Sequence, residues 1–147
     1  MSSFIFNFNY ECFYKKYKLV YKKIEPKIIY MPFSQDTHTD HPVISKVLNN
    51  TIKWFRFSHI KRVLMYETLS ETNFNFMSST KFEPNVFNNI SNYLDEKVEI
   101  MHTYHTELGN FPFPRSVKTI KALAALRGSH SGYDAAEAFE LVYEKVQ

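Results

Sequence analysis

The sequence predicts an α/β fold in which a mostly parallel sheet is flanked by helices. In the first half of the chain, segments with helical spacing alternate with short β-rich segments, and the links between them are short. That order is typical of parallel strands joined by helical crossovers. The 147 residues, of which 44% are apolar, suit one domain with a substantial core.

The N-terminal elements are predicted to be a strand and a helix. Residues 4–10 alternate aromatic with other side chains, a period typical of a half-buried strand. Residues 11–25 place apolar side chains at helical spacing with lysines opposite, and Pro26 ends the helix. The first thirty residues contain six lysines and two glutamates. We interpret these lysines as a solvated helix face in preference to a phosphate or membrane contact.

Two buried strands are predicted at residues 27–31 and 62–67, with a helix between them that starts at His41 or Pro42 and runs to about Arg56. Ligands bind outside the carboxyl ends of strands in parallel sheets. We therefore expect the loop after the first strand and residues 68–72 after the second strand to lie at one rim.

The second half of the chain is predicted to begin with an edge strand at residues 86–90. Two helices follow, one from Ser91 or Asn92 to Gly109 and one from Pro114 to a C-cap at Gly128. The tail at residues 135–146 suits either a helix or a strand. Arg127 continues the apolar stripe of the second of these helices, so its guanidinium needs a partner. We favour a structural salt bridge or carbonyl clamp over the alternative, a substrate contact.

Composition excludes several classes of protein. The single cysteine, Cys12, rules out an internal disulfide and fits a reducing compartment, so we expect a cytoplasmic protein. No apolar run approaches the roughly 20 residues of a membrane span, and the N-terminus does not have the pattern of a signal peptide. The three glycines all follow residue 108, which excludes a glycine-rich phosphate loop. No nucleic-acid partner is predicted.

The densest group of ligating side chains is the run D-T-H-T-D-H at residues 36–41. His38 and His41 lie three residues apart at a predicted strand-to-helix junction, and neutral imidazoles are good zinc ligands. Asp36 or Asp40 could ligate the same ion or orient the histidines. The alternative is a polar loop whose aspartate caps the following helix.

Three motifs in order resemble the PIG-L/LmbE family of zinc-dependent N-deacetylases, which have a Rossmann-like sheet. They are P-F-S-Q-D-T-H-T-D-H-P-V-I, R-V-L-M-Y-E-T-L-S-E-T-N-F, and the closing segment P-R-S-V-K-T-I-K-A-L-A-A-L-R-G-S-H-S-G-Y-D-A-A-E-A-F-E. The resemblance covers about residues 18–143. The resemblance implies a substrate of the N-acetylglucosamine-conjugate type and a zinc cofactor. It implies that His41 is a zinc ligand, that His38 is the general acid or stabilises the oxyanion, and that Asp40 orients His38.

One family motif has no counterpart here. The N-terminal H-P-D-D of the family supplies two zinc ligands and the catalytic base, whereas no histidine or aspartate precedes residue 36 in this chain. Residues 1–17 also lack a clear counterpart, so residues 1–147 are expected to form a single partial, N-terminally truncated domain. Three hypotheses follow: a zinc-dependent N-deacetylase that is incomplete in this chain; an inactive remnant or interaction domain completed by a homo-oligomer or a complementing chain; and, less favoured, a basic binding module that uses the N-terminal lysines.

Overall fold

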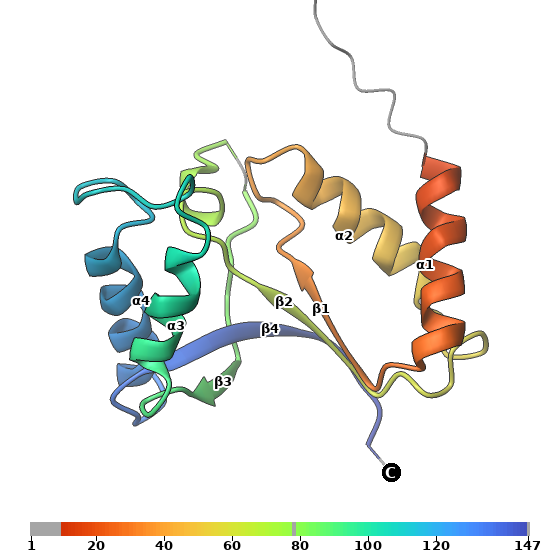
Figure 1. The fold of residues 1–147 in the computed structure, drawn as a ribbon. Coiled ribbons are helices and arrows are strands. Elements are labelled where there is room, and N and C mark those ends of the chain that lie inside the picture. The colour runs from red at the N-terminus through yellow and green to blue at the C-terminus, as the bar shows by residue number, and fades with distance from the viewer. Residues whose placement is uncertain (1–9, 78, 147) are drawn as a thin grey trace, which may run out of the picture.

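The computed structural model describes residues 10–77 and 79–146, which form an open four-stranded sheet flanked by helices (Figure 1). The predicted α/β class is confirmed. The elements in chain order are α1 Tyr10–Ile24, β1 Ile28–Pro32, α2 Asp40–Thr51, β2 Arg62–Tyr66, the 3-10 helix η1 Thr72–Phe74, β3 Val86–Asn89, α3 Leu94–His102, α4 Val117–Ser129 and β4 Ala136–Glu144.

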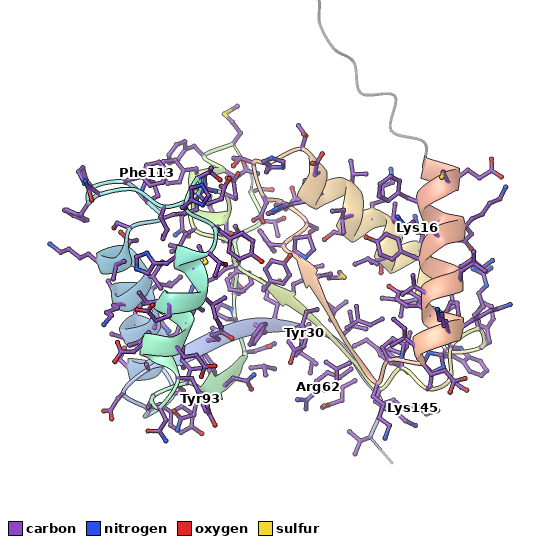
Figure 2. The ribbon with its side chains drawn as sticks, in the orientation of Figure 1. Lys16, Tyr30, Arg62, Tyr93, Phe113 and Lys145 are labelled. Carbon is purple, nitrogen blue, oxygen red and sulfur yellow. The ribbon has the colours of Figure 1, made fainter. Side chains whose placement is uncertain are left out.

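The main core lies between the sheet and the first two helices. Successive side chains of a strand point to opposite faces, so Ile29 and Met31 of β1 are buried against α1 and α2. The same core includes Tyr21, Leu48, Phe57, Ile60 and Val63. Tyr30 lies on the opposite face of β1 and is 48% exposed (Figure 2). Helices α3 and α4 lie toward the other end of the sheet, over β4 and β3 (Figure 1).

The sheet has the order β1-β2-β4-β3 and is mixed. The predicted parallel pairing holds for β1 and β2, where Ile29 lies opposite Val63. In the part of the chain that the structure describes, β4 pairs antiparallel with both β2 and β3, so the expectation of a mostly parallel sheet is corrected. The physical reason is the insertion of the C-terminal strand between two earlier strands, a long-range pairing that local periodicity does not specify.

Most element positions agree with the sequence predictions, and the differences have local causes. The tail forms a strand, and β3 is an edge strand as predicted. Helix α2 ends at Thr51 instead of Arg56, because Ile52 adopts an extended conformation. Gly128 lies within α4 and is not its C-cap. The predicted strand at residues 4–10 falls outside the described residues, except that Tyr10 begins α1.

Two further boundaries differ. Helix α3 ends at His102, well before Gly109. Helix α4 begins after Ser116, whose hydroxyl accepts a hydrogen bond from the Thr119 N–H at 3.2 Å, instead of at Pro114. Within residues 10–77 and 79–146, no helix has the length and apolar character needed to cross a membrane.

Candidate active site

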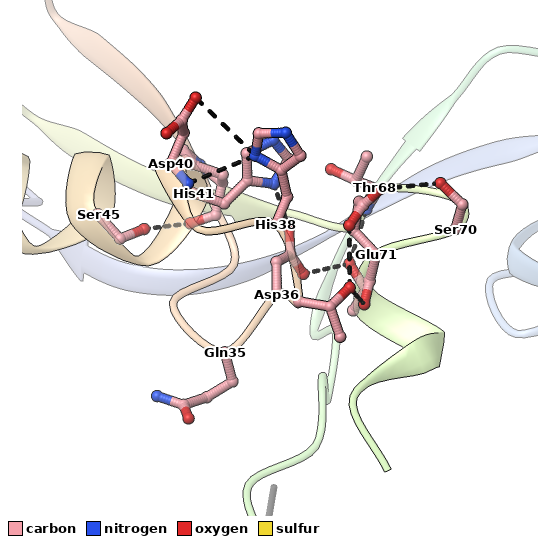
Figure 3. Close-up of polar contacts among 12 residues, drawn as sticks. Gln35, Asp36, His38, Asp40, His41, Ser45, Thr68, Ser70 and Glu71 are labelled. Atoms are coloured by element: carbon pink, nitrogen blue, oxygen red, sulfur yellow. Dashed lines mark hydrogen bonds and ion pairs between the residues drawn. The ribbon is translucent and has the colours of Figure 1, made fainter. Parts of the chain in front are cut away.

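The loops that follow β1 and β2 meet at the carboxyl edge of these two parallel strands (Figure 3). The Thr72 hydroxyl donates to Asp36 Oδ1 at 2.6 Å, and the Thr37 hydroxyl donates to Glu71 Oε2 at 2.9 Å. These contacts join residues more than thirty positions apart in the chain. The predicted shared rim is therefore confirmed.

His41 and Asp36 form a hydrogen-bonded pair at this rim. The distance from His41 Nδ1 to Asp36 Oδ2 is 2.7 Å, and the Asp36 side chain is fully buried. A carboxylate only accepts hydrogen bonds, so His41 Nδ1 is the donor in this pair and Nε2 takes no part in it. A histidine that binds a metal ion through one ring nitrogen commonly donates the N–H of the other to a carboxylate. The same hydrogen bond also orients a histidine that acts as a base.

His38 and Asp40 lie beside this pair and are exposed. The ring centroids of His38 and His41 are 5.3 Å apart, so the two imidazoles share one volume. Asp40 Oδ2 is 4.0 Å from His38 Nδ1, too far for a hydrogen bond, and the Asp40 N–H lies 3.4 Å from the same nitrogen. In the described structure, the carboxylate that directly orients a histidine is Asp36. Its role could have been found only from the turn that brings it back to His41.

The capping alternative is not supported by the geometry of the α2 N-terminus. Thr39 occupies the N-cap position with a helical backbone, and its own side chain accepts no capping hydrogen bond. The aspartates of residues 36–41 are thus not held in place as helix caps. Asp36 instead accepts from Thr72 and His41.

Glu71 is a rim carboxylate that the sequence prediction did not single out. Burial alone would raise the pKa of Glu71, but hydrogen bonds from Thr37 and Ser70, with the nearby charges of His38 and Arg115, outweigh it and lower the pKa below the ordinary value. Ser70 has a φ of +74°, in the left-handed region that favours glycine. The signal in the sequence that could have identified Glu71 is its position shortly after a strand that ends at the rim.

The side chains at the rim do not form a complete zinc site. A catalytic zinc needs three protein ligands and an open position, and the described residues contain no group of three histidine, cysteine, aspartate or glutamate side chains placed for a metal ion. Both oxygens of Asp36 already accept hydrogen bonds. Among the rim side chains, His41 is the candidate ligand whose ring is held by a hydrogen bond to a buried carboxylate.

Arg127 forms the buried salt bridge that the sequence favoured. Its Nε and Nη2 donate to the two carboxylate oxygens of Glu67 at 2.7 and 2.6 Å. Both side chains line a cavity of about 530 Å³ between the sheet and helices α3 and α4. The histidines do not line this cavity, which meets the rim only through the segment 67–69 and Arg115. The chemistry-bearing side chains, and not this cavity, define the candidate site.

Comparison with known proteins agrees with the architecture. No family model matches the chain. The conserved protein TT1542 from Thermus thermophilus superposes with a TM-score of 0.66 and 18% identity, covering 91% of this chain and 60% of that protein. N,N'-diacetylchitobiose deacetylase from Pyrococcus horikoshii superposes with a TM-score of 0.66 and 12% identity, covering 92% of this chain and 52% of the deacetylase. The chain therefore has the fold of these proteins and spans little more than half of their length.

Proposed function

We propose that this chain forms part of an N-deacetylase that hydrolyses the acetamide of N-acetylated amino-sugar conjugates, with its reacting groups at the rim of residues 36–41. The main support is the pair of His41 with the buried Asp36 at the carboxyl end of β1, where α/β enzymes bind their ligands. The fold shared with a diacetylchitobiose deacetylase supports the reaction class.

Each rim residue has a proposed role in amide hydrolysis. Asp36 fixes the His41 ring and leaves Nε2 free to ligate a metal ion, as the motif resemblance implies. His38, which is half-exposed and 5.3 Å from His41 between ring centroids, can donate a proton to the leaving amine or a hydrogen bond to the oxyanion. Asp40 lies close enough to stabilise a protonated His38. On this proposal His41 is one zinc ligand, and the remaining ligands come from outside the described residues.

A second candidate is an interaction domain whose site is completed by another chain. β1 is an edge strand that pairs only with β2 within the described residues, and Ile28 and Tyr30 on its outer face are about half-exposed. An open edge with apolar side chains is a surface on which a further strand can pair. The incomplete donor set at the adjacent rim favours the same view.

Acetate release tests the first proposal. The chain, in the assembly that supplies its remaining ligands, is incubated with N,N'-diacetylchitobiose and assayed for acetate, with bound zinc measured in parallel. We expect His41→Gln to abolish release, and Asp36→Asn to lower zinc affinity by roughly 10–100-fold because it removes the orienting carboxylate. His105→Gln, an exposed histidine in the segment after α3, is the matched control.

Two outcomes separate the candidates. Acetate release that persists in both His41→Ala and the presence of a chelator contradicts the assignment of the rim. Absence of release from a protein that sediments as an oligomer or a stable hetero-complex favours the interaction domain. A monodisperse monomer that melts cooperatively contradicts that second candidate.

A further inference from the structure

The end of the molecule formed by α1 and the loop after α2 has a surface with no role in the proposed reaction. Lys16 lies on α1 at this end, away from α3 and α4 (Figures 1 and 2). We define the basic face as a set of exposed side chains that lie on one side of α1. We define the aromatic loop as residues 52–57. The basic face consists of Lys15, Lys16, Leu19, Lys22 and Lys23.

Positive charge is concentrated on α1. The helix contains five lysines and one acid, Glu11, whereas the whole chain has a formal net charge of only +3. Glu11 pairs with Lys15 at 2.8 Å. Among the described residues, no carboxylate lies within ion-pair distance of Lys16, Lys22 or Lys23. Their charges are available to an anionic partner.

Large apolar side chains are exposed on α1 and on the loop that packs against it. Leu19 lies between the lysines on the helix and is 69% exposed, and Trp54 in the aromatic loop is 70% exposed. Phe55 packs edge-on against Trp54, with ring centroids 5.8 Å apart, and is also exposed. A face of solvated lysines does not by itself explain why a leucine and a tryptophan are also exposed at this end of the molecule.

Contacts to α1 hold the aromatic loop in place. Arg56 Nη1 donates to the Tyr14 hydroxyl at 2.6 Å, and the buried ring of Phe57 packs edge-on against Tyr21 with centroids 5.3 Å apart. The loop emerges beside the C-terminal half of α1 (Figure 1). Trp54 and Phe55 therefore project from a loop whose base is packed against α1.

We propose that the basic face and the aromatic loop bind peripherally to the surface of an anionic lipid bilayer. Lysines attract anionic headgroups, and tryptophan and leucine insert at the boundary between headgroups and acyl chains. A nucleic acid or another soluble polyanion would use the lysines and leave Leu19 and Trp54 in water. From the sequence, the lysines were interpreted as a solvated helix face. The exposed apolar side chains, which only the structure reveals, favour a membrane contact instead.

Vesicle binding with a built-in reporter tests this proposal. Trp54 is the only tryptophan of the chain, so its emission reports the polarity around the aromatic loop. The full chain is mixed with vesicles of phosphatidylcholine alone or of equimolar phosphatidylcholine and phosphatidylserine. We expect co-sedimentation and a blue shift of Trp54 emission only with phosphatidylserine, and weakening of both as salt rises.

Charge-matched variants locate the surface. Lys16→Gln with Lys22→Gln is expected to weaken partitioning about 25-fold, since each lysine near an anionic leaflet contributes roughly fivefold. Lys118→Gln with Lys121→Gln removes the same charge from exposed positions of α4 and is expected to leave partitioning unchanged. Trp54→Ala is expected to weaken binding without altering its salt dependence.

Three results would overturn the proposal. They are equal binding to both kinds of vesicle, equal loss in the α1 and α4 variants, and binding to phosphatidylserine vesicles without a blue shift. Heparin is the soluble polyanion for comparison. If heparin binds as tightly as the vesicles and Trp54→Ala changes neither affinity, the surface is a polyanion site and not a membrane site.

Discussion

Removal of the Arg127 guanidinium should destabilise the fold more than any single substitution at the rim. The two hydrogen bonds to Glu67 measure 2.7 and 2.6 Å, and the Arg127 and Glu67 side chains are only 13% and 8% exposed. Arg127→Met leaves the Glu67 carboxylate buried without its counter-charge. Breaking such a pair costs about 3–5 kcal/mol, a large part of the roughly 5–15 kcal/mol that stabilises a domain. The melting temperature should fall by roughly 10 °C.

Urea denaturation of three variants distinguishes the causes. Arg127→Lys keeps the charge and loses the planar fork, so we expect a smaller loss than in Arg127→Met. The double variant Arg127→Met with Glu67→Leu removes both charges, and we expect it to recover much of the lost stability. If Arg127→Met unfolds within about 1 kcal/mol of the parent, a value typical of exposed pairs, the pair is hydrated and the reasoning from burial is refuted.

Two further stability predictions concern a backbone contact and the rim. Gly128→Ala should destabilise by about 1–3 kcal/mol, the usual cost of overpacking, because its Cβ would clash with the Tyr133 carbonyl oxygen. Alanine normally favours a helix, so a gain in the melting temperature would contradict this. The lowered pKa of Glu71 means that its contribution to stability is present above the ordinary value of 4.5 and is lost as pH falls through the folded-state pKa. Glu71→Gln should flatten the acid side of a pH–stability curve, and an unchanged slope would show that the carboxylate is not held as described.

The parts of the fold that were predicted correctly depend on local signals. β1 and β2 are short apolar runs close to proline or charged residues, and α1 has a clear apolar stripe, so each was placed within one or two residues. The shared rim followed from a general rule on parallel strands and needed no knowledge of side-chain contacts. Arg127 was interpreted correctly because a charge on an apolar stripe requires a partner.

The parts that could not be predicted depend on long-range pairing. The segment A-E-A-F-E-L-V-Y-E suits either a helix or a strand, and its place between β2 and β3 decides the matter. Gly128 resembles a helix C-cap in sequence, whereas its real constraint is the close approach of residues 133–135. In both cases the deciding contact comes from a partner that local spacing does not identify.

The choice between Asp36 and Asp40 as the orienting carboxylate shows the same limit at the candidate site and constrains its chemistry. The backbone N–H of Asp36 donates to the Phe33 carbonyl at 3.3 Å, and this turn directs Asp36 back toward His41, five residues later. Thr72 donates to the other oxygen of Asp36, so hydrogen bonds at both oxygens fix the orientation of this carboxylate. The contact that Asp36 makes with His41 is that of a carboxylate that orients the imidazole ring.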